Sequence, residues 1–81
     1  MRLLNTATLR LETYVGKETP SYAILSHTWA NDEILFEDVW EPSWRRRISD
    51  RRKKGFSKVR DSCAQARRDG HGHIWIDTCC I

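Results

Sequence analysis

Two short apolar segments with an amphipathic segment between them most constrain how this chain can fold. Residues 22–25 open the run YAILSHTW and residues 74–76 lie in HIWIDTCCI, and both have the length and composition of buried strands. Between them, a stripe of apolar side chains recurs at helical spacing, formed by Phe56, Val59, Cys63 and Ala66. Gly70 is placed to cap the end of that helix. Strand, helix and strand in this order predict a parallel, right-handed βαβ unit.

The chain before these segments predicts a β-hairpin. Residues 2–13 form two extended pieces around a turn at 5–8, with Leu9 and Leu11 on one face. The predicted fold class is therefore α/β, with a parallel βαβ core preceded by a short β-hairpin. At 81 residues the chain is one domain at most. A domain of this size buries only about 60% of its unfolded surface, so its margin of stability should be small.

A short helix is predicted between the first strand of the βαβ unit and Pro42. Asn31 or Asp32 is placed as its N-cap, acidic side chains follow in the first turn, and the proline should stop it. The apolar residues at helical spacing are Ile34, Leu35, Val39 and Trp40. Glu37 and Asp38 are adjacent, and neighbouring helical positions diverge by about 100°, so a solvated face is a better interpretation than a pair of catalytic acids.

The net charge of +3 conceals an asymmetry along the chain. Residues 1–44 hold 3 basic and 7 acidic side chains, whereas residues 45–81 hold 11 basic and 4 acidic ones. Most of the basic charge lies between Arg45 and Lys54, in a segment that we interpret as a solvated loop closed by Gly55. Clustered Lys and Arg can contact phosphates or direct nuclear import. Without interleaved aromatic residues or a recognised nucleic-acid-binding motif, nucleic acid is not a favoured partner.

The cysteines and the hydropathy pattern bear on compartment and on metals. The chain has three cysteines, Cys63, Cys79 and Cys80, and the last two are adjacent. An odd number of cysteines with two adjacent favours buried thiols in a reducing compartment over a disulfide scaffold. Together with His71 and His73 they match no zinc-binding spacing, so no metal site and no cofactor are predicted. No signal peptide or run of about 20 apolar residues occurs, so we expect a cytoplasmic protein without a membrane partner.

Polar side chains follow both predicted parallel strands. Ligands of open parallel sheets bind beyond the carboxyl ends of the strands, where Ser26, His27, Trp29 and Asp77 should open onto one edge. We therefore predict a ligand-binding crevice formed by these four residues. The alternative is structural: a hydroxyl and an imidazole bonded within the strand exit, an aspartate that caps the next turn, and tryptophans, Trp75 in particular, that belong to the core. No G-x-S-x-G, G-x-G-x-x-G or P-loop motif is present.

The two runs YAILSHTW and HIWIDTCCI, in this order and at this distance, resemble the heterokaryon incompatibility (HET) domain family of filamentous fungi. The segments MRLLNTATLRLETYVG, FEDV and KKGFSKVRDSCAQARRDG are similar to one large subgroup of that family. The first family motif falls on Tyr22, Ala23, Leu25, Ser26, His27 and Trp29. The second falls on Trp75, Ile76, Asp77, Cys80 and Ile81. Ala30 stands where family members usually have glycine, which matters if that turn needs a positive φ.

The resemblance implies more than the residues themselves do. It implies a partial TIR-like or flavodoxin-like three-layer fold. In this interpretation, residues 1–81 are the N-terminal part of a HET domain, and they stop after the second family motif. The family continues with a third motif containing Trp, Gln and Glu, and a catalytic glutamate of the TIR type would lie there. The resemblance also implies a role in allorecognition and programmed cell death.

Two functions from different classes follow from this resemblance. The first is a signalling and interaction module that contacts other HET-domain or incompatibility proteins or associates with itself. The second is a nucleotide-processing domain that cleaves NAD, although these residues hold no complete catalytic constellation and the catalytic residues are unknown. An inactive fragment is the third alternative, because parallel sheets are normally covered on both faces and this chain has few helices to cover them.

Overall fold

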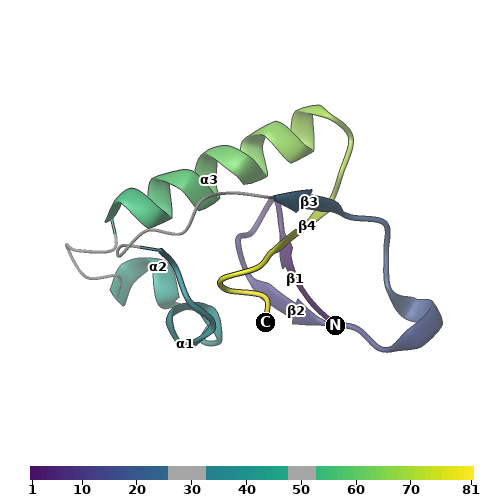
Figure 1. Ribbon diagram of the computed structural model, residues 1–81, viewed down its shortest axis with the longest axis horizontal. Coiled ribbons are helices and arrows are strands. Elements are labelled where there is room, and N and C mark those ends of the chain that lie inside the picture. The colour runs from purple at the N-terminus through teal and green to yellow at the C-terminus, as the bar shows by residue number, and fades with distance from the viewer. Residues whose placement is uncertain (26–32, 48–52) are drawn as a thin grey trace.

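The computed structural model describes residues 1–25, 33–47 and 53–81. Its helices and strands are, in chain order, β1 (Arg2–Asn5), β2 (Leu11–Thr13), the short 3-10 helix η1 (Gly16–Glu18), β3 (Ala23–Leu25), α1 (Phe36–Val39), α2 (Trp44–Arg47), α3 (Lys53–Arg68) and β4 (His73–Ile76). This order confirms the α/β class (Figure 1).

The four strands form one mixed sheet in the order β2-β1-β4-β3. β1 pairs antiparallel with β2 and with β4, whereas β3 and β4 are parallel, with Ala23 opposite Ile74 and Leu25 opposite Ile76. Helix α3 lies in the connection between these two strands, after α1 and α2, so the predicted parallel pairing of the two strands is confirmed. The predicted hairpin is confirmed as β1 and β2.

The turn of the hairpin is shaped by Asn5. Its Oδ1 accepts hydrogen bonds from the amides of Ala7, at 2.9 Å, and Thr8, at 3.0 Å, and its carbonyl accepts one from the Leu9 amide at 2.8 Å. Leu9 has a φ of +60°, a conformation that a branched side chain rarely adopts. Its side chain is 7% exposed, so burial of the leucine in the core offsets the backbone cost.

Helix α3 carries the predicted apolar stripe and ends as predicted. Val59, Cys63 and Ala66 are buried, and Phe56 packs partly buried against them. At the C-terminal end, the His71 amide donates to the Ala66 carbonyl at 2.8 Å and the Gly70 amide donates to the Arg67 carbonyl at 3.0 Å. With φ of +90° at Gly70, this is a Schellman motif.

The start of α3 differs from the prediction. The helix begins at Lys53 and includes Gly55, which the sequence placed at the end of a loop. Lysine is a good helix former and one internal glycine costs only about 1 kcal/mol relative to alanine, so the packed helix extends through it. The other end of the predicted loop is also wrong, because Arg45 and Arg46 lie in helix α2.

Helix α1 is shorter than predicted. It begins at Phe36, and the Asp38 carboxylate accepts a hydrogen bond from the Leu35 amide at 2.8 Å at its start. Ile34 is buried before the helix and Trp40 is 63% exposed after it. The predicted caps, Asn31 and Asp32, lie outside the described residues.

One hydrophobic core lies between the helices and one face of the sheet. Leu4, Ile74 and Ile76 from the sheet join Val39, Trp44, Val59 and Cys63 from the helices in a single buried cluster. Among the described residues, α1, α2 and α3 thus share one side of the sheet (Figure 1), which does not match the expected three layers. The prediction that residues 22–25 form a buried strand is also wrong, because β3 is at the sheet edge and Ile24 is 66% exposed.

No helix in the described part of the chain has both the length and the apolar character needed to cross a membrane.

Candidate functional site

The parallel pair β3–β4 defines the edge where the sequence places a crevice. Leu25 lies opposite Ile76 at the last paired position, and Asp77 follows directly. In parallel sheets, ligands bind beyond such carboxyl ends. Asp77 is therefore where the prediction puts it, at the strand end and half-buried. Ser26, His27 and Trp29 lie outside the described residues, so their contribution to a crevice stays a prediction.

The chain turns sharply after β4. The Cys80 amide donates to the Ile76 carbonyl at 2.9 Å, which closes one helical turn over residues 77–79. Thr78 is only 6% exposed, and its Oγ1 is buried with no hydrogen-bond partner among the described residues. An unsatisfied buried hydroxyl typically costs about 1–3 kcal/mol. Such groups are rare in native proteins, which marks this turn as unusual.

The three thiols lie in the core rather than on alternate sides of an extended strand. Cys63, Cys79 and Cys80 are all buried and unbridged, which confirms the predicted burial. Burial raises the pKa of the Cys63 thiol to about 12. A hydrogen bond with Cys80, together with burial, raises the pKa of Cys79, and the same hydrogen bond lowers the pKa of Cys80. Protonated thiols are poor nucleophiles, so their burial favours a structural role for Cys63 and Cys79.

A polar cluster that the sequence did not predict joins β2 to β4 across β1. Glu12 Oε1 accepts a hydrogen bond from His73 Nε2 at 2.8 Å and another from the Tyr14 hydroxyl, and Glu12 Oε2 accepts one from Asn5 Nδ2 at 3.2 Å. The Tyr14 and His73 rings meet edge to face, with centroids 5.5 Å apart. The spacing of Glu12 and Tyr14 indicates one strand face, but the contact with His73 depends on strand order.

The cluster perturbs two ionisable groups. The hydrogen bond from Tyr14, followed by those from His73 and Asn5, outweighs desolvation and lowers the pKa of Glu12. The same contact with the Glu12 carboxylate raises the pKa of Tyr14. A carboxylate held by several donors stays ionised, so this cluster fixes the hairpin to β4 at neutral pH. It lies at the start of β4, at the other end of the strand from Asp77.

A partly buried ion pair anchors the chain that leads into α1. Glu33 Oε1 lies 2.6 Å from Lys58 Nζ on α3, and the glutamate side chain is 4% exposed. This pair was also missed, because its partners are 25 residues apart and neither belongs to a recognisable motif. Glu33 is the first described residue after the first motif, and this ion pair holds it against α3.

Comparison with known proteins adds the identity of the domain. The family model described as heterokaryon incompatibility protein (HET) matches residues 22–81. The chain belongs to the HET family. It is also 45% identical, over 64 residues, to the vegetative incompatibility protein HET-E-1 of Podospora anserina. The matched region covers 76% of this chain and 4% of that protein. No solved structure gives a significant match. The HET domain here thus spans a small part of the length of that relative.

The HET match contains both motifs, and the structure shows that much of them is structural. Ile76 and Cys80 are core residues, and Ala23, Leu25 and Trp75 pack partly buried against the core. The predicted core position of Trp75 is thus confirmed in part. Tyr22 is half-buried and Ile81 is 64% exposed. Within the described residues, Asp77 is the motif residue that combines ionisable chemistry with a position at the strand ends.

Proposed function

We propose that this HET domain acts as a signalling and interaction module in fungal allorecognition and programmed cell death, by associating with a second HET-bearing chain. That second chain is another copy of itself or another incompatibility protein. Family membership supports the role, and the name of the relative, a vegetative incompatibility protein, agrees with it. The observation that carries the proposal is the exposed edge of the sheet.

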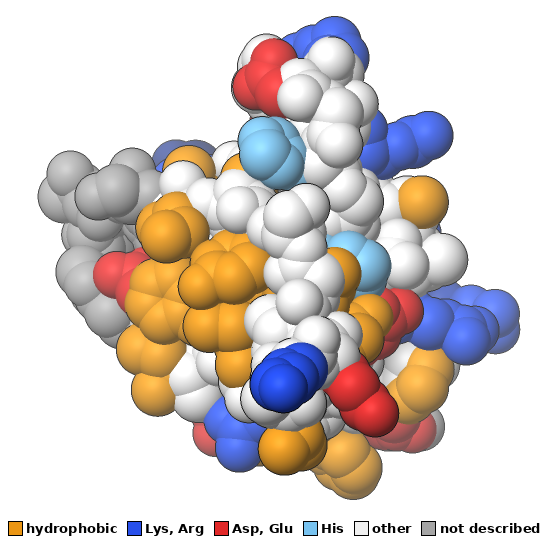
Figure 2. Space-filling model, turned by 90° about the vertical axis from the view of Figure 1, so that its right-hand side faces the viewer, with side chains coloured by type: hydrophobic (Ala, Val, Ile, Leu, Met, Phe, Trp, Pro, Cys, Tyr) orange, Lys and Arg blue, Asp and Glu red, His pale blue; other side chains and the backbone are white. Residues whose placement is uncertain are grey.

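Among the described strands, β3 has no neighbour on its outer side, and it also carries an exposed apolar side chain. It is the last strand of the sheet, and Ile24 is 66% exposed on the face opposite Ala23 and Leu25, which pack on the core. Figure 2 views the molecule from the right-hand side of Figure 1 and shows hydrophobic side chains gathered in one patch there. Exposed strand edges pair readily with other chains, and contiguous apolar patches mark association sites.

Sedimentation velocity over the micromolar to millimolar range tests the association. We expect concentration-dependent association of the chain. Ile24→Lys should raise the dissociation constant about tenfold, because a charge would be buried in the contact. Trp40→Lys is the matched control, since Trp40 is 63% exposed, close to the value for Ile24, but follows α1 on the helical side of the sheet. A monodisperse monomer that also fails to bind any HET-bearing partner would contradict the proposal.

A second function, cleavage of NAD by a TIR-like site, is supported by the end of β4. Asp77 follows the parallel strand, and a ligand atom would satisfy the Thr78 hydroxyl beside it. For these 81 residues alone we expect no turnover, because half of a site lacks the preorganised groups that catalysis needs. Release of nicotinamide by the purified chain, abolished by Asp77→Ala, would show that expectation to be wrong.

The proposed module acts in the cytoplasm. Three buried, unbridged thiols suit a reducing compartment. The competing view of an inactive fragment is tested by thermal unfolding monitored by circular dichroism. A cooperative transition supports a folded module, whereas a broad, non-cooperative change indicates a fragment without a stable core.

A further inference from the structure

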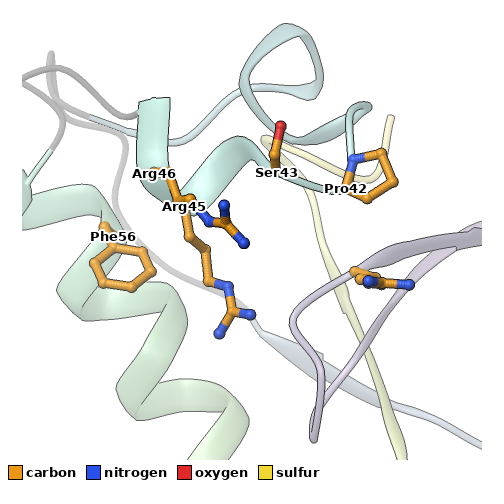
Figure 3. A pocket seen from close by; sticks show the side chains of 6 residues that line it. Pro42, Ser43, Arg45, Arg46 and Phe56 are labelled. Atoms are coloured by element: carbon orange, nitrogen blue, oxygen red, sulfur yellow. The ribbon is translucent and has the colours of Figure 1, made fainter.

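A pocket of about 410 Å³ lies where the β1–β2 hairpin meets α2 and α3. It is lined by Arg10, Pro42, Ser43, Arg45, Arg46 and Phe56. Figure 3 shows the guanidinium groups of Arg45 and Arg46 directed from α2 into the space between Phe56 and Pro42. The lining residues belong to neither HET motif, and Asp77 is not among them.

In the described part of the chain, the arginine charges around this pocket are not paired with carboxylates. None of the ion pairs between described residues joins the side chain of Arg10, Arg45 or Arg46 to a carboxylate. Like charges that face one pocket repel one another, and a bound anion removes that repulsion. Guanidinium is the group best suited to bidentate contacts with phosphate oxygens, because its donors form a rigid planar fork.

The buried Trp44 holds the parts of the pocket in place. Its Nε1–H donates to the Leu9 carbonyl at 2.8 Å, which fixes the residue before Arg10. Its backbone directly precedes Arg45, and its ring meets Phe56 edge to face, with centroids 5.7 Å apart. One core side chain therefore positions the hairpin, α2 and α3 relative to one another. Such a preformed pocket reduces the entropic cost of ligand binding.

We propose that this pocket binds a small phosphate-bearing anion. The three arginines and the Ser43 hydroxyl supply donors to the phosphate oxygens, and the Phe56 ring borders the remainder of the ligand. The volume is within the range of about 300–1,000 Å³ typical of small-molecule sites. This inference does not depend on the association proposed above, because it concerns a different surface and a different class of ligand.

Isothermal titration of the chain with inorganic pyrophosphate tests the proposal. We expect saturable binding. Arg10→Gln and Arg46→Gln should each raise the dissociation constant about tenfold or more, since each removes a charge-assisted hydrogen bond. Arg67→Gln and Arg68→Gln remove the same charge from the far end of α3 and are matched controls. They should change the constant by about twofold or less, because distant surface charges are screened by salt.

Two results would overturn the proposal. One is the absence of saturable pyrophosphate binding by the unmutated chain. The other is an equal loss of affinity in the pocket variants and the control variants, which indicates a general attraction of a basic chain for polyanions. Arg46→Lys separates charge from geometry, because it keeps the charge but loses the fork, and it should still weaken binding. Circular dichroism of each variant confirms that the fold is retained.

Discussion

Replacing Trp44 with phenylalanine should destabilise the domain more than its conservative chemistry suggests. The tryptophan is 2% exposed, and its Nε1–H donates to the Leu9 carbonyl across 35 residues of chain. Phenylalanine keeps an aromatic ring near Phe56 but leaves the Leu9 carbonyl without this donor. It also leaves unfilled the volume of the second ring.

The magnitude follows from these two losses. A buried acceptor left unsatisfied costs about 1–3 kcal/mol. The smaller ring adds about 1 kcal/mol for lost packing and a residual cavity. We therefore expect the free energy of unfolding to fall by about 2–4 kcal/mol, from a total of about 4–12 kcal/mol for a domain of this length. At about 4–8 °C per kcal/mol, Tm should drop by about 8–32 °C.

Urea unfolding followed by far-ultraviolet circular dichroism measures this change without relying on tryptophan fluorescence. The matched control is Trp40→Phe, because Trp40 is 63% exposed and follows α1. Its free energy of unfolding should change by about 0.5 kcal/mol or less. Equal losses in the two variants would refute the reasoning, because they would mean that burial and the bond to Leu9 contribute nothing.

Three further predictions concern charge, backbone and thiols. The pKa of Glu12 is lowered from 4.5, chiefly by Tyr14, so its contribution to stability is present above the unfolded pKa and lost as the pH falls. In urea titrations, Glu12→Gln should therefore lower the free energy of unfolding at neutral pH but not in acid. The same difference in unfolding free energy between variant and unmutated chain at both pH values would contradict this. Gly70→Ala should cost about 1–2 kcal/mol of unfolding free energy, because φ is +90° there, whereas Gly72→Ala should cost about 0.5 kcal/mol or less. Cys63, with a pKa of about 12, should resist alkylation at mildly alkaline pH until urea unfolds the chain, as mass spectrometry of the modified peptide can show.

The elements that sequence reasoning predicted well depend on local signals. The stripe through Val59 and Cys63 repeats over the helix, and Gly70 supplies the conformation that ends it. Asn5 caps the hairpin turn through contacts within three residues. Such interactions are present in the sequence itself, because the partners are neighbours along the chain.

The elements that sequence reasoning missed depend on contacts between distant segments. An apolar run such as residues 22–25 predicts a strand, but its burial depends on whether a further strand lies beside it. Within residues 1–25, 33–47 and 53–81, β3 has a neighbour on one side only. Trp44 directly precedes the expected loop and has no predicted role, and its hydrogen bond to the Leu9 carbonyl holds the start of α2 on the hairpin. The position of Asp77 was predictable because parallel strands align their carboxyl ends.

The face of the sheet opposite the helices has two halves with different chemistry. Toward β2, Glu12, Tyr14 and His73 satisfy one another through hydrogen bonds, and Leu3, which pairs with Glu12, is fully buried beside them. Toward β3, Ile24 lies opposite Trp75 in the parallel pair and is largely exposed, with no polar group of its own to satisfy. Association that buries the polar half would have to desolvate an ionised carboxylate, which is costly, whereas burial of the apolar half is favourable. A contact of this HET domain should therefore centre on β3 and β4, and substitutions at Ile24 should weaken it more than substitutions at Glu12.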